Sequence, residues 1–224
     1  MVKIYNTYKL AASEGSSTLA SQKLIIAHST ANPNTSAKNN AAYEKRTWNN
    51  AYVHFIVDDT GAYSVGAVPY VAWGAGGTAN QRAVLQVELC EFTDKKKARK
   101  AYENYVNLIR QYAKKYNVSL TLDSKNTTNG VKTHKWVSNN FHQTDHTDPV
   151  RYLSSIGISQ AQFAKDLKNG FSSKKAVSKE KTYMVKKGDT LYSIAKANKI
   201  SLQTLKFKNN LKDNFIRIGQ ILKV

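Results

Sequence analysis

The segment that decides the fold is AVLQVELCEFTDKKKARKAYENYVNLIRQYAKKY, residues 83–116. Its first ten residues alternate as a strand does, with one face formed by Leu85, Val87 and Leu89 and the other by Gln86, Glu88 and Cys90. Small and aromatic residues then recur at three- and four-residue spacing over residues 94–116, which predicts a long amphipathic helix capped by Thr93 or Asp94. A strand that leads into such a helix favours an α/β fold. The carboxylate of Glu88 on an otherwise apolar strand requires an explanation.

Two further strands are predicted upstream. Residues 23–28, KLIIAH, are an apolar run that ends in a histidine, and residues 52–57, YVHFIV, are β-branched and aromatic before an Asp-Asp-Thr-Gly turn. A weaker helix follows Ser159 and stops near Gly170. The first part of the chain is therefore predicted to be α/β, with a mixed central β-sheet flanked by helices.

The composition is that of a folded protein with an anionic partner. The chain has 224 residues, of which 41% are hydrophobic and 22% charged, so general disorder is excluded. Its formal net charge of +19 favours nucleic acid, a membrane surface or an acidic polymer as a partner. Cys90 is the only cysteine, which excludes an internal disulfide and any metal site built from several cysteines.

Targeting signals are not evident in the sequence. The first 17 residues contain no apolar run of signal-peptide length, and no later stretch approaches the length of a membrane span. We therefore expect synthesis in the cytoplasm, no membrane partner, and release by another component if the protein acts outside the membrane.

A change in composition divides the chain. Serine and lysine replace the apolar periodicity near residues 170–181. This change predicts a larger domain at residues 1–171, of a size that can hold an active site, a basic linker at 172–181 and a small domain at 182–224. Residues 1–171 carry 21 basic and 12 acidic side chains, and residues 182–224 carry nine and two. The positive charge is thus spread over both domains.

The small domain has a βααβ pattern. We expect strands at residues 183–186 and 220–224, a helix at 190–198 capped by Asp189, and a helix at 202–208 capped by Ser201. At about 43 residues it lies near the lower size limit for a domain that folds without disulfides or metals.

Histidines and aspartates suggest a metal site. Three of the five histidines, His134, His142 and His146, fall within thirteen residues that also contain Asp145, with Asp148 just beyond. Together with His28, at the end of a strand, this loop could supply three protein ligands and leave a position for water, as catalytic zinc sites do. The alternative is a polar loop whose imidazoles only form hydrogen bonds. We expect His54 to be structural or to face substrate, and His142 to face solvent.

The ordered strings LIIAHST, AYVHFIVDDTGAYS, VAWGAG, LQVELCEF and THKW…TDHTDP resemble the zinc-dependent N-acetylmuramoyl-L-alanine amidases of the amidase-2 type, which are related to peptidoglycan-recognition proteins. The resemblance covers about residues 20–168. It implies one Zn²⁺, held by His28, His134 and Asp148. It also implies Glu88 as general base and His146 as the residue that stabilises the oxyanion. Cys90 is then a small buried hydrophobe.

Some positions depart from the family pattern. The interval from His134 to His146 is longer than in compact members, so Asp145 or His146 stays open as the third ligand. Gly74 stands where many relatives have a histidine, and Val53 where one branch has a catalytic tyrosine. We expect substrate contacts from His54 and Trp73, although these departures leave the contacts near Trp73 open.

Residues 182–224 resemble a LysM module through YMVKKGDTLYSIA, the NNL string and the closing IGQILKV. The resemblance implies a shallow groove for N-acetylglucosamine-containing glycans. The groove is expected to be lined by Gly188, Asp189, Thr190, Leu191 and Ile216. Asp189 and Leu191 also have structural interpretations, as a helix cap and a core residue.

Together these features favour a phage-type endolysin that cleaves the amide bond between N-acetylmuramic acid and L-alanine of peptidoglycan and acts on the wall after holin-type release. The basic charge would favour anionic wall polymers. A non-catalytic peptidoglycan-recognition protein, a bacterial autolysin and a recycling amidase are the alternatives. Nucleic-acid binding is disfavoured because no basic motif with interleaved aromatics is present.

Overall fold

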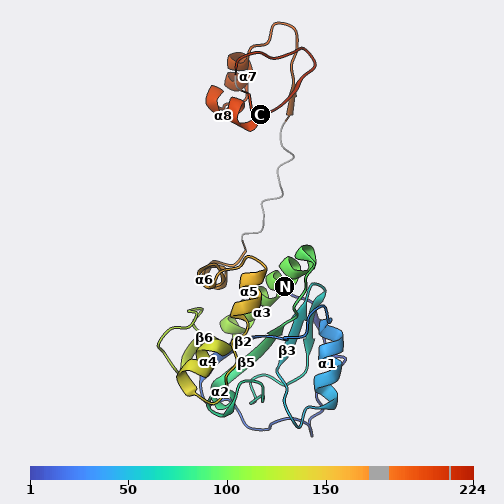
Figure 1. The fold of residues 1–224 in the computed structure, drawn as a ribbon, viewed down its shortest axis with the longest axis vertical. Coiled ribbons are helices and arrows are strands. Elements are labelled where there is room, and N and C mark those ends of the chain that lie inside the picture. The colour runs from blue at the N-terminus through green and yellow to red at the C-terminus, as the bar shows by residue number, and fades with distance from the viewer. Residues whose placement is uncertain (172–181, 212) are drawn as a thin grey trace. The chain divides into compact units, whose positions relative to one another are not determined.

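The computed structural model describes residues 1–171, 182–211 and 213–224. The chain divides into two compact units, unit 1 (Met1–Phe171) and unit 2 (Ser172–Val224). Figure 1 shows the sheet and helices of unit 1 and the smaller unit 2. The linker predicted at residues 172–181 lies outside the described residues.

Unit 1 contains a six-stranded mixed sheet. Its strands are β1 (Ile4–Tyr5), β2 (Lys23–Ser29), β3 (Phe55–Asp58), β4 (Gly61–Ser64), β5 (Ala83–Leu89) and β6 (Asn129–Thr133). Their order is β1-β4-β3-β5-β2-β6; β3 and β4 pair antiparallel, and the other neighbours pair parallel. The helices are α1 (Ala37–Arg46), α2 (Gly77–Arg82), α3 (Lys95–Tyr116), α4 (His134–Phe141), α5 (Val150–Ser155) and α6 (Gln160–Asn169).

Helices cover both faces of the sheet, and strand β2 is therefore buried on both of its faces. Leu24 and Ile26 pack in one apolar cluster with residues of α2 and α4. Ile25 and Ala27, which point to the opposite face, belong to the larger core with the apolar side of α3. The α/β fold with a mixed sheet flanked by helices is therefore confirmed.

Helix α3 matches its predicted bounds because both ends are capped. The Asp94 carboxylate accepts hydrogen bonds from the backbone N–H groups of Lys96 and Lys97, and Asn117 ends the helix in a left-handed conformation. Its length places an apolar face against β3 and β5. None of the described helices combines the length and apolarity that a membrane crossing requires.

Strand β3 is shorter than predicted. The expectation for residues 52–57 is wrong at its start, because β3 begins at Phe55. The carbonyls of Tyr52 and Val53 accept hydrogen bonds from Trp73 and Gly66, which belong to a loop. These residues are thus tied to irregular backbone instead of a neighbouring strand.

Unit 2 has the predicted βααβ order. It consists of β7 (Thr182–Met184), α7 (Leu191–Ala197), α8 (Leu202–Lys208) and β8 (Ile221–Lys223), with β7 and β8 paired antiparallel. Its small core contains Val185, Leu191, Ile194, Ala195, Leu205, Leu222 and Val224. Ser201 caps α8 as expected.

The predicted cap of the first helix of unit 2 is wrong by one residue. Thr190, not Asp189, is the N-cap of α7, and it forms a reciprocal capping box with Ser193. The Asp189 carboxylate instead accepts hydrogen bonds from the backbone N–H of Lys186 and the hydroxyl of Tyr183. It therefore closes the turn that precedes the helix.

Candidate functional site

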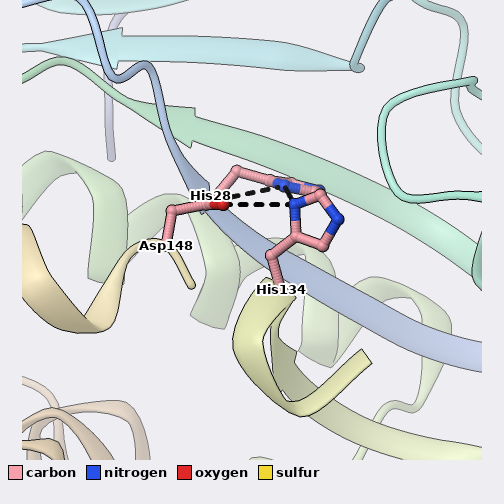
Figure 2. A group of neighbouring side chains, drawn as sticks. All are labelled: His28, His134 and Asp148. Atoms are coloured by element: carbon pink, nitrogen blue, oxygen red, sulfur yellow. Dashed lines mark hydrogen bonds and ion pairs between the residues drawn. The ribbon is translucent and has the colours of Figure 1, made fainter. Parts of the chain in front are cut away.

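Three side chains from distant parts of the sequence meet at one edge of the sheet. His28 is the penultimate residue of β2, and His134 opens α4 directly after β6. Because β2 and β6 pair in parallel, with Ala27 opposite Thr133, the two histidines leave the sheet at the same edge. Asp148 approaches them from the loop before α5, as Figure 2 shows.

The three ligand atoms form a compact triangle. His28 Nδ1 lies 3.0 Å from His134 Nδ1 and 3.4 Å from Asp148 Oδ2, and His134 Nδ1 lies 3.3 Å from Asp148 Oδ1. Two ligands that bind zinc at about 2.0–2.1 Å with tetrahedral angles are about 3.3–3.4 Å apart. Among the described residues, these three form the group of histidine, cysteine and carboxylate side chains that could hold a metal ion.

The protonation states suit a divalent cation. Burial alone would raise the pKa of Asp148, but hydrogen bonds and charge interactions with His134 and His28 hold it well below its usual range. Burial lowers the pKa of His134, against the opposing effect of Asp148. At neutral pH the site therefore offers a carboxylate and a neutral imidazole.

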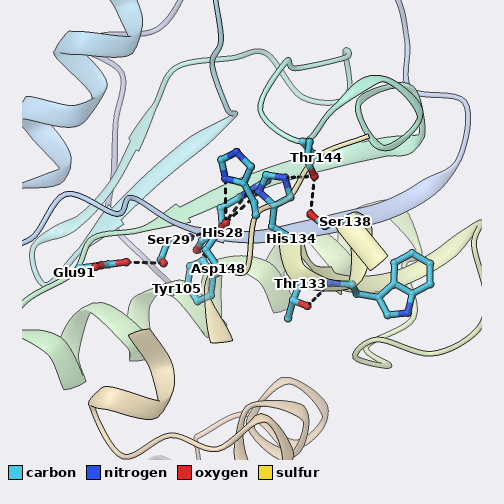
Figure 3. Close-up of polar contacts among 12 residues, drawn as sticks. His28, Ser29, Glu91, Tyr105, Thr133, His134, Ser138, Thr144 and Asp148 are labelled. Atoms are coloured by element: carbon cyan, nitrogen blue, oxygen red, sulfur yellow. Dashed lines mark hydrogen bonds and ion pairs between the residues drawn. The ribbon is translucent and has the colours of Figure 1, made fainter. Parts of the chain in front are cut away.

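Backbone and hydroxyl groups hold these ligands in place. The Ser29 N–H donates to Asp148 Oδ2 at 3.1 Å, and the buried hydroxyl of Tyr105, on α3, donates to the His28 carbonyl at 3.0 Å. The Ser29 hydroxyl donates to Glu91 Oε1 at 2.8 Å. Figure 3 shows these contacts around the triangle. Hydrogen bonds from the core thus hold His28 and Asp148 in position.

The structure brings Asp148, and not the alternatives, into the triangle. Asp145 is exposed and lies outside the group. His146 stacks in parallel on His134, with ring centroids 4.4 Å apart, and its side chain is 60% exposed. His146 Nδ1 is 3.6 Å from Asp148 Oδ1. Its ring therefore lies beside the ligands, on a side that solvent reaches.

Glu88 lies beside His28, on the neighbouring strand of the sheet. The two residues are register partners in the parallel β2/β5 pair, so their side chains leave the same face. Glu88 lines a cavity of about 270 Å³ together with Thr30 and Glu44, and its Oε2 is buried with no hydrogen-bond partner among the described residues. Burial, followed by the charge of Asp148, raises the pKa of Glu88 well above its ordinary value. Such a carboxyl can take up or deliver a proton.

His54 is structural, so its expected contact with substrate is corrected. Its side chain is fully buried. The Gln86 N–H donates to Nδ1 at 2.8 Å, and Nε2 lies 2.8 Å from the Tyr70 carbonyl, to which it donates. Both ring nitrogens are therefore occupied by backbone groups.

This burial predicts acid sensitivity. Burial lowers the pKa of His54 to about 4, whereas the unfolded chain has a value near 6.5. Below about pH 6.5 the unfolded state binds a proton that the folded state does not, so stability falls as the pH drops toward 4. The slope approaches about 1.4 kcal/mol per pH unit. Denaturant unfolding of wild type and His54→Gln, followed by tryptophan fluorescence, should show this slope reduced in the variant.

The fluorescence assay reports on unit 1 because Trp48, Trp73 and Trp136 all lie there. His142→Gln, at an exposed residue, is the matched control and should keep the wild-type slope. If His54→Gln does not fold, NMR titration of the wild-type imidazole gives the same answer. Equal slopes in both variants, or titration of His54 near pH 6.5, would contradict this role.

The remaining predicted residues of unit 1 lie in packed surroundings. Trp73 is half-buried and contacts the rings of Trp48 and Tyr52, and its expected role toward substrate stays a prediction. Cys90 is fully buried, as a small hydrophobe should be. A Cβ at Gly74 would lie 2.6 Å from Val53 Cγ1, so a histidine at this position would require the surroundings to shift.

The proposed groove residues of unit 2 divide into core and surface. Leu191 is buried in the core, as its structural interpretation expects, and its place in a glycan groove stays a prediction. Ile216 is partly buried against the same core. Gly188 adopts φ +87°, and Thr190 and Asp189 are engaged in the local turn. The glycan roles of all five residues stay predictions.

Sequence reasoning missed the residues that support the ligands. Tyr105 belongs to the apolar periodicity of residues 94–116 and Ser29 follows His28 in LIIAHST, and neither pattern indicates a contact with the ligands. Glu44 is half-buried on α1, far in sequence from Glu88, and loss of hydration raises the pKa of its carboxyl to about 8. The TDH string places the hydroxyl of Thr144 directly before two candidate ligands, Asp145 and His146.

Two sequence families match the chain. The family described as N-acetylmuramoyl-L-alanine amidase matches residues 19–151, and the family described as LysM domain matches residues 183–224. An endolysin of Listeria phage A511 is 42% identical over 170 residues, which is 75% of this chain and 50% of that protein. A lytic amidase of Streptococcus pneumoniae phage HB-3 is 34% identical over 182 residues, 79% of this chain and 57% of that protein. The chain thus spans about half the length of the curated relatives it matches.

Solved structures resemble the chain over about three quarters of its length. The Staphylococcus aureus hydrolase AmiA, in complex with its ligand, has a TM-score of 0.67 and 26% identity, with 75% of this chain and 82% of that chain covered. The catalytic domain of XlyA has a TM-score of 0.58 and 24% identity, with 74% and 99% covered, and shares the fold.

Proposed function

The chain belongs to the N-acetylmuramoyl-L-alanine amidase family and carries a LysM domain, and on this premise we propose that it hydrolyses the amide bond between N-acetylmuramic acid and L-alanine in peptidoglycan. The observation that carries the proposal is the triangle of His28, His134 and Asp148, whose spacing and charge suit one Zn²⁺. The similar endolysin and lytic amidase support a lytic role at the bacterial wall.

A zinc ion on these three ligands would leave a fourth position for water and lower the pKa of that water to about 7. Glu88, on the neighbouring strand, would accept a proton from the attacking water and deliver it to the departing amine as the C–N bond breaks. His146, at the exposed side of the ligands, would donate a hydrogen bond to the oxyanion. The products are the lactyl carboxylate and a free L-alanine amino group.

Unit 2 would hold the enzyme on its substrate. Its LysM domain is proposed to bind the glycan strands, through the turn at Gly188 and Asp189 and through Ile216. The net charge of +19 would add attraction to anionic wall polymers. By analogy with the phage relatives, the proposed place of action is the bacterial wall. The proposal includes release from the cytoplasm through holin-type lesions.

Chelation tests the proposal. Digestion of purified peptidoglycan should release new amino termini with no new reducing sugars, and mass spectrometry should find stem peptides that begin with L-alanine. Removal of metal should abolish this release, and stoichiometric Zn²⁺ should restore it. Release by metal-free protein would contradict the zinc mechanism. Tight wall binding without any release would favour the non-catalytic recognition protein.

A further inference from the structure

The loop that carries Asp148 packs on Gly76 and Gly77, at the start of α2. The backbone N–H of Thr78 donates to Gln143 Oε1 at 2.6 Å, across 65 residues of sequence. Gly76, at φ +84°, lies against Thr144: a Cβ added there would be 2.8 Å from Thr144 Cγ2. Gly76 is therefore the position whose missing side chain makes room for Thr144.

Thr144 reaches a metal ligand from this docked position. Its Oγ1 is 3.3 Å from His134 Nε2 and 2.6 Å from Ser138 Oγ, as Figure 3 shows. His134 Nδ1 faces the other two ligands, so its lone pair must stay free if it is to bind a metal. The ring proton then belongs on Nε2, which donates to the Thr144 hydroxyl, and that hydroxyl shares a second hydrogen bond with Ser138.

The other histidine of the site has no such support. His28 also turns Nδ1 toward the triangle, but its Nε2 is buried with no hydrogen-bond partner among the described residues. Of the two ligand histidines, His134 is therefore the one whose ring is held by a hydrogen bond to a hydroxyl group of the described residues. Outer hydrogen bonds of this kind set the tautomer and orientation of metal-binding histidines.

We propose that Thr144 is a positioning residue of the metal centre, which holds His134 in the tautomer with a free Nδ1, and that Gly76 provides the seat in which Thr144 docks. This role explains Gly76 within the glycine-rich segment VAWGAGG, residues 71–77. The inference rests on the proposed zinc site but not on the proposed reaction.

Metal affinity tests Thr144 without substrate. Thr144→Val keeps the shape and removes the hydroxyl, so zinc affinity, measured by competition with a chromogenic chelator, should fall about 10- to 100-fold. Thr144→Ser keeps the hydroxyl and should recover most of the affinity. The visible absorption of the Co²⁺-substituted protein should change in Thr144→Val and not in Thr144→Ser.

Gly76→Ala tests the seat, with Gly157→Ala as its control. Gly157 has a similar φ of +79°, but among the described residues no atom comes within 4 Å of an added Cβ. Both variants strain the backbone, whereas Gly76→Ala alone pushes on Thr144. Zinc affinity should fall in Gly76→Ala and not in Gly157→Ala, at matched thermal stability of the metal-free proteins.

The outcomes separate this inference from the proposed function. Wild-type protein that binds no zinc would refute the metal site itself. Wild type that binds zinc tightly, with Thr144→Val equally tight and the same Co²⁺ spectrum, would refute the positioning role alone. Equal losses in Gly76→Ala and Gly157→Ala would show that the seat acts only through stability.

Discussion

Asp148→Ala is expected to abolish zinc binding and peptidoglycan cleavage together. The substitution removes one of three ligands and the only carboxylate among them, which leaves two imidazoles that carry no negative charge. It also leaves the Ser29 N–H without its acceptor. The loss of zinc affinity should exceed the factor of about 10–100 that a lost outer hydrogen bond costs. Zinc per protein after dialysis and release of amino groups from purified wall are the measurements.

Asp145→Ala is the matched control. Asp145 lies three residues earlier in the same loop, is exposed, and is outside the ligand triangle. This variant should keep stoichiometric zinc and normal cleavage. If zinc instead remained in Asp148→Ala and disappeared in Asp145→Ala, the third ligand would be misassigned.

Elements with strong local signals were predictable from the sequence. Helix α3 has a capping aspartate, a long apolar periodicity and an asparagine at its end, and the structure begins and ends it at those residues. Strand β2 is a plain apolar run, so its length and the position of His28 near its end followed directly. Such elements carry their signals within their own residues, so their bounds can be read without knowledge of distant contacts.

Contacts between distant segments were not predictable. YVHFIV has strand composition, yet its first residues bond to a loop, and His54 turns into the core to meet the Gln86 N–H, 32 residues away. Nothing in the local pattern distinguishes this buried ring from an exposed one. The packing of Gly76 on Thr144 likewise depends on two loops that are adjacent only in the folded chain.

Glu88→Gln is expected to lower turnover by about 10²–10⁴-fold while zinc stays bound, because glutamine keeps the shape of glutamate but can neither accept nor deliver the proton. Glu88 is a cross-strand neighbour of His28 and is not one of the ligands, so metal content should not change. Steady-state release of amino groups, with zinc measured on the same samples, gives both quantities.

Glu44→Gln separates proton transfer at Glu88 from the effect of the negative charge in the cavity. Glu44 lines the same cavity, and its Oε2 accepts the Val53 N–H, a contact that the amide oxygen of glutamine can keep. If Glu88 acts as the base, Glu44→Gln should lose far less activity than Glu88→Gln. Equal losses would mean that the negative charge of the cavity matters and not a proton transfer at Glu88. Loss of zinc in Glu88→Gln would instead show that Glu88 acts through the metal site, because a base that only moves protons leaves the ligands intact.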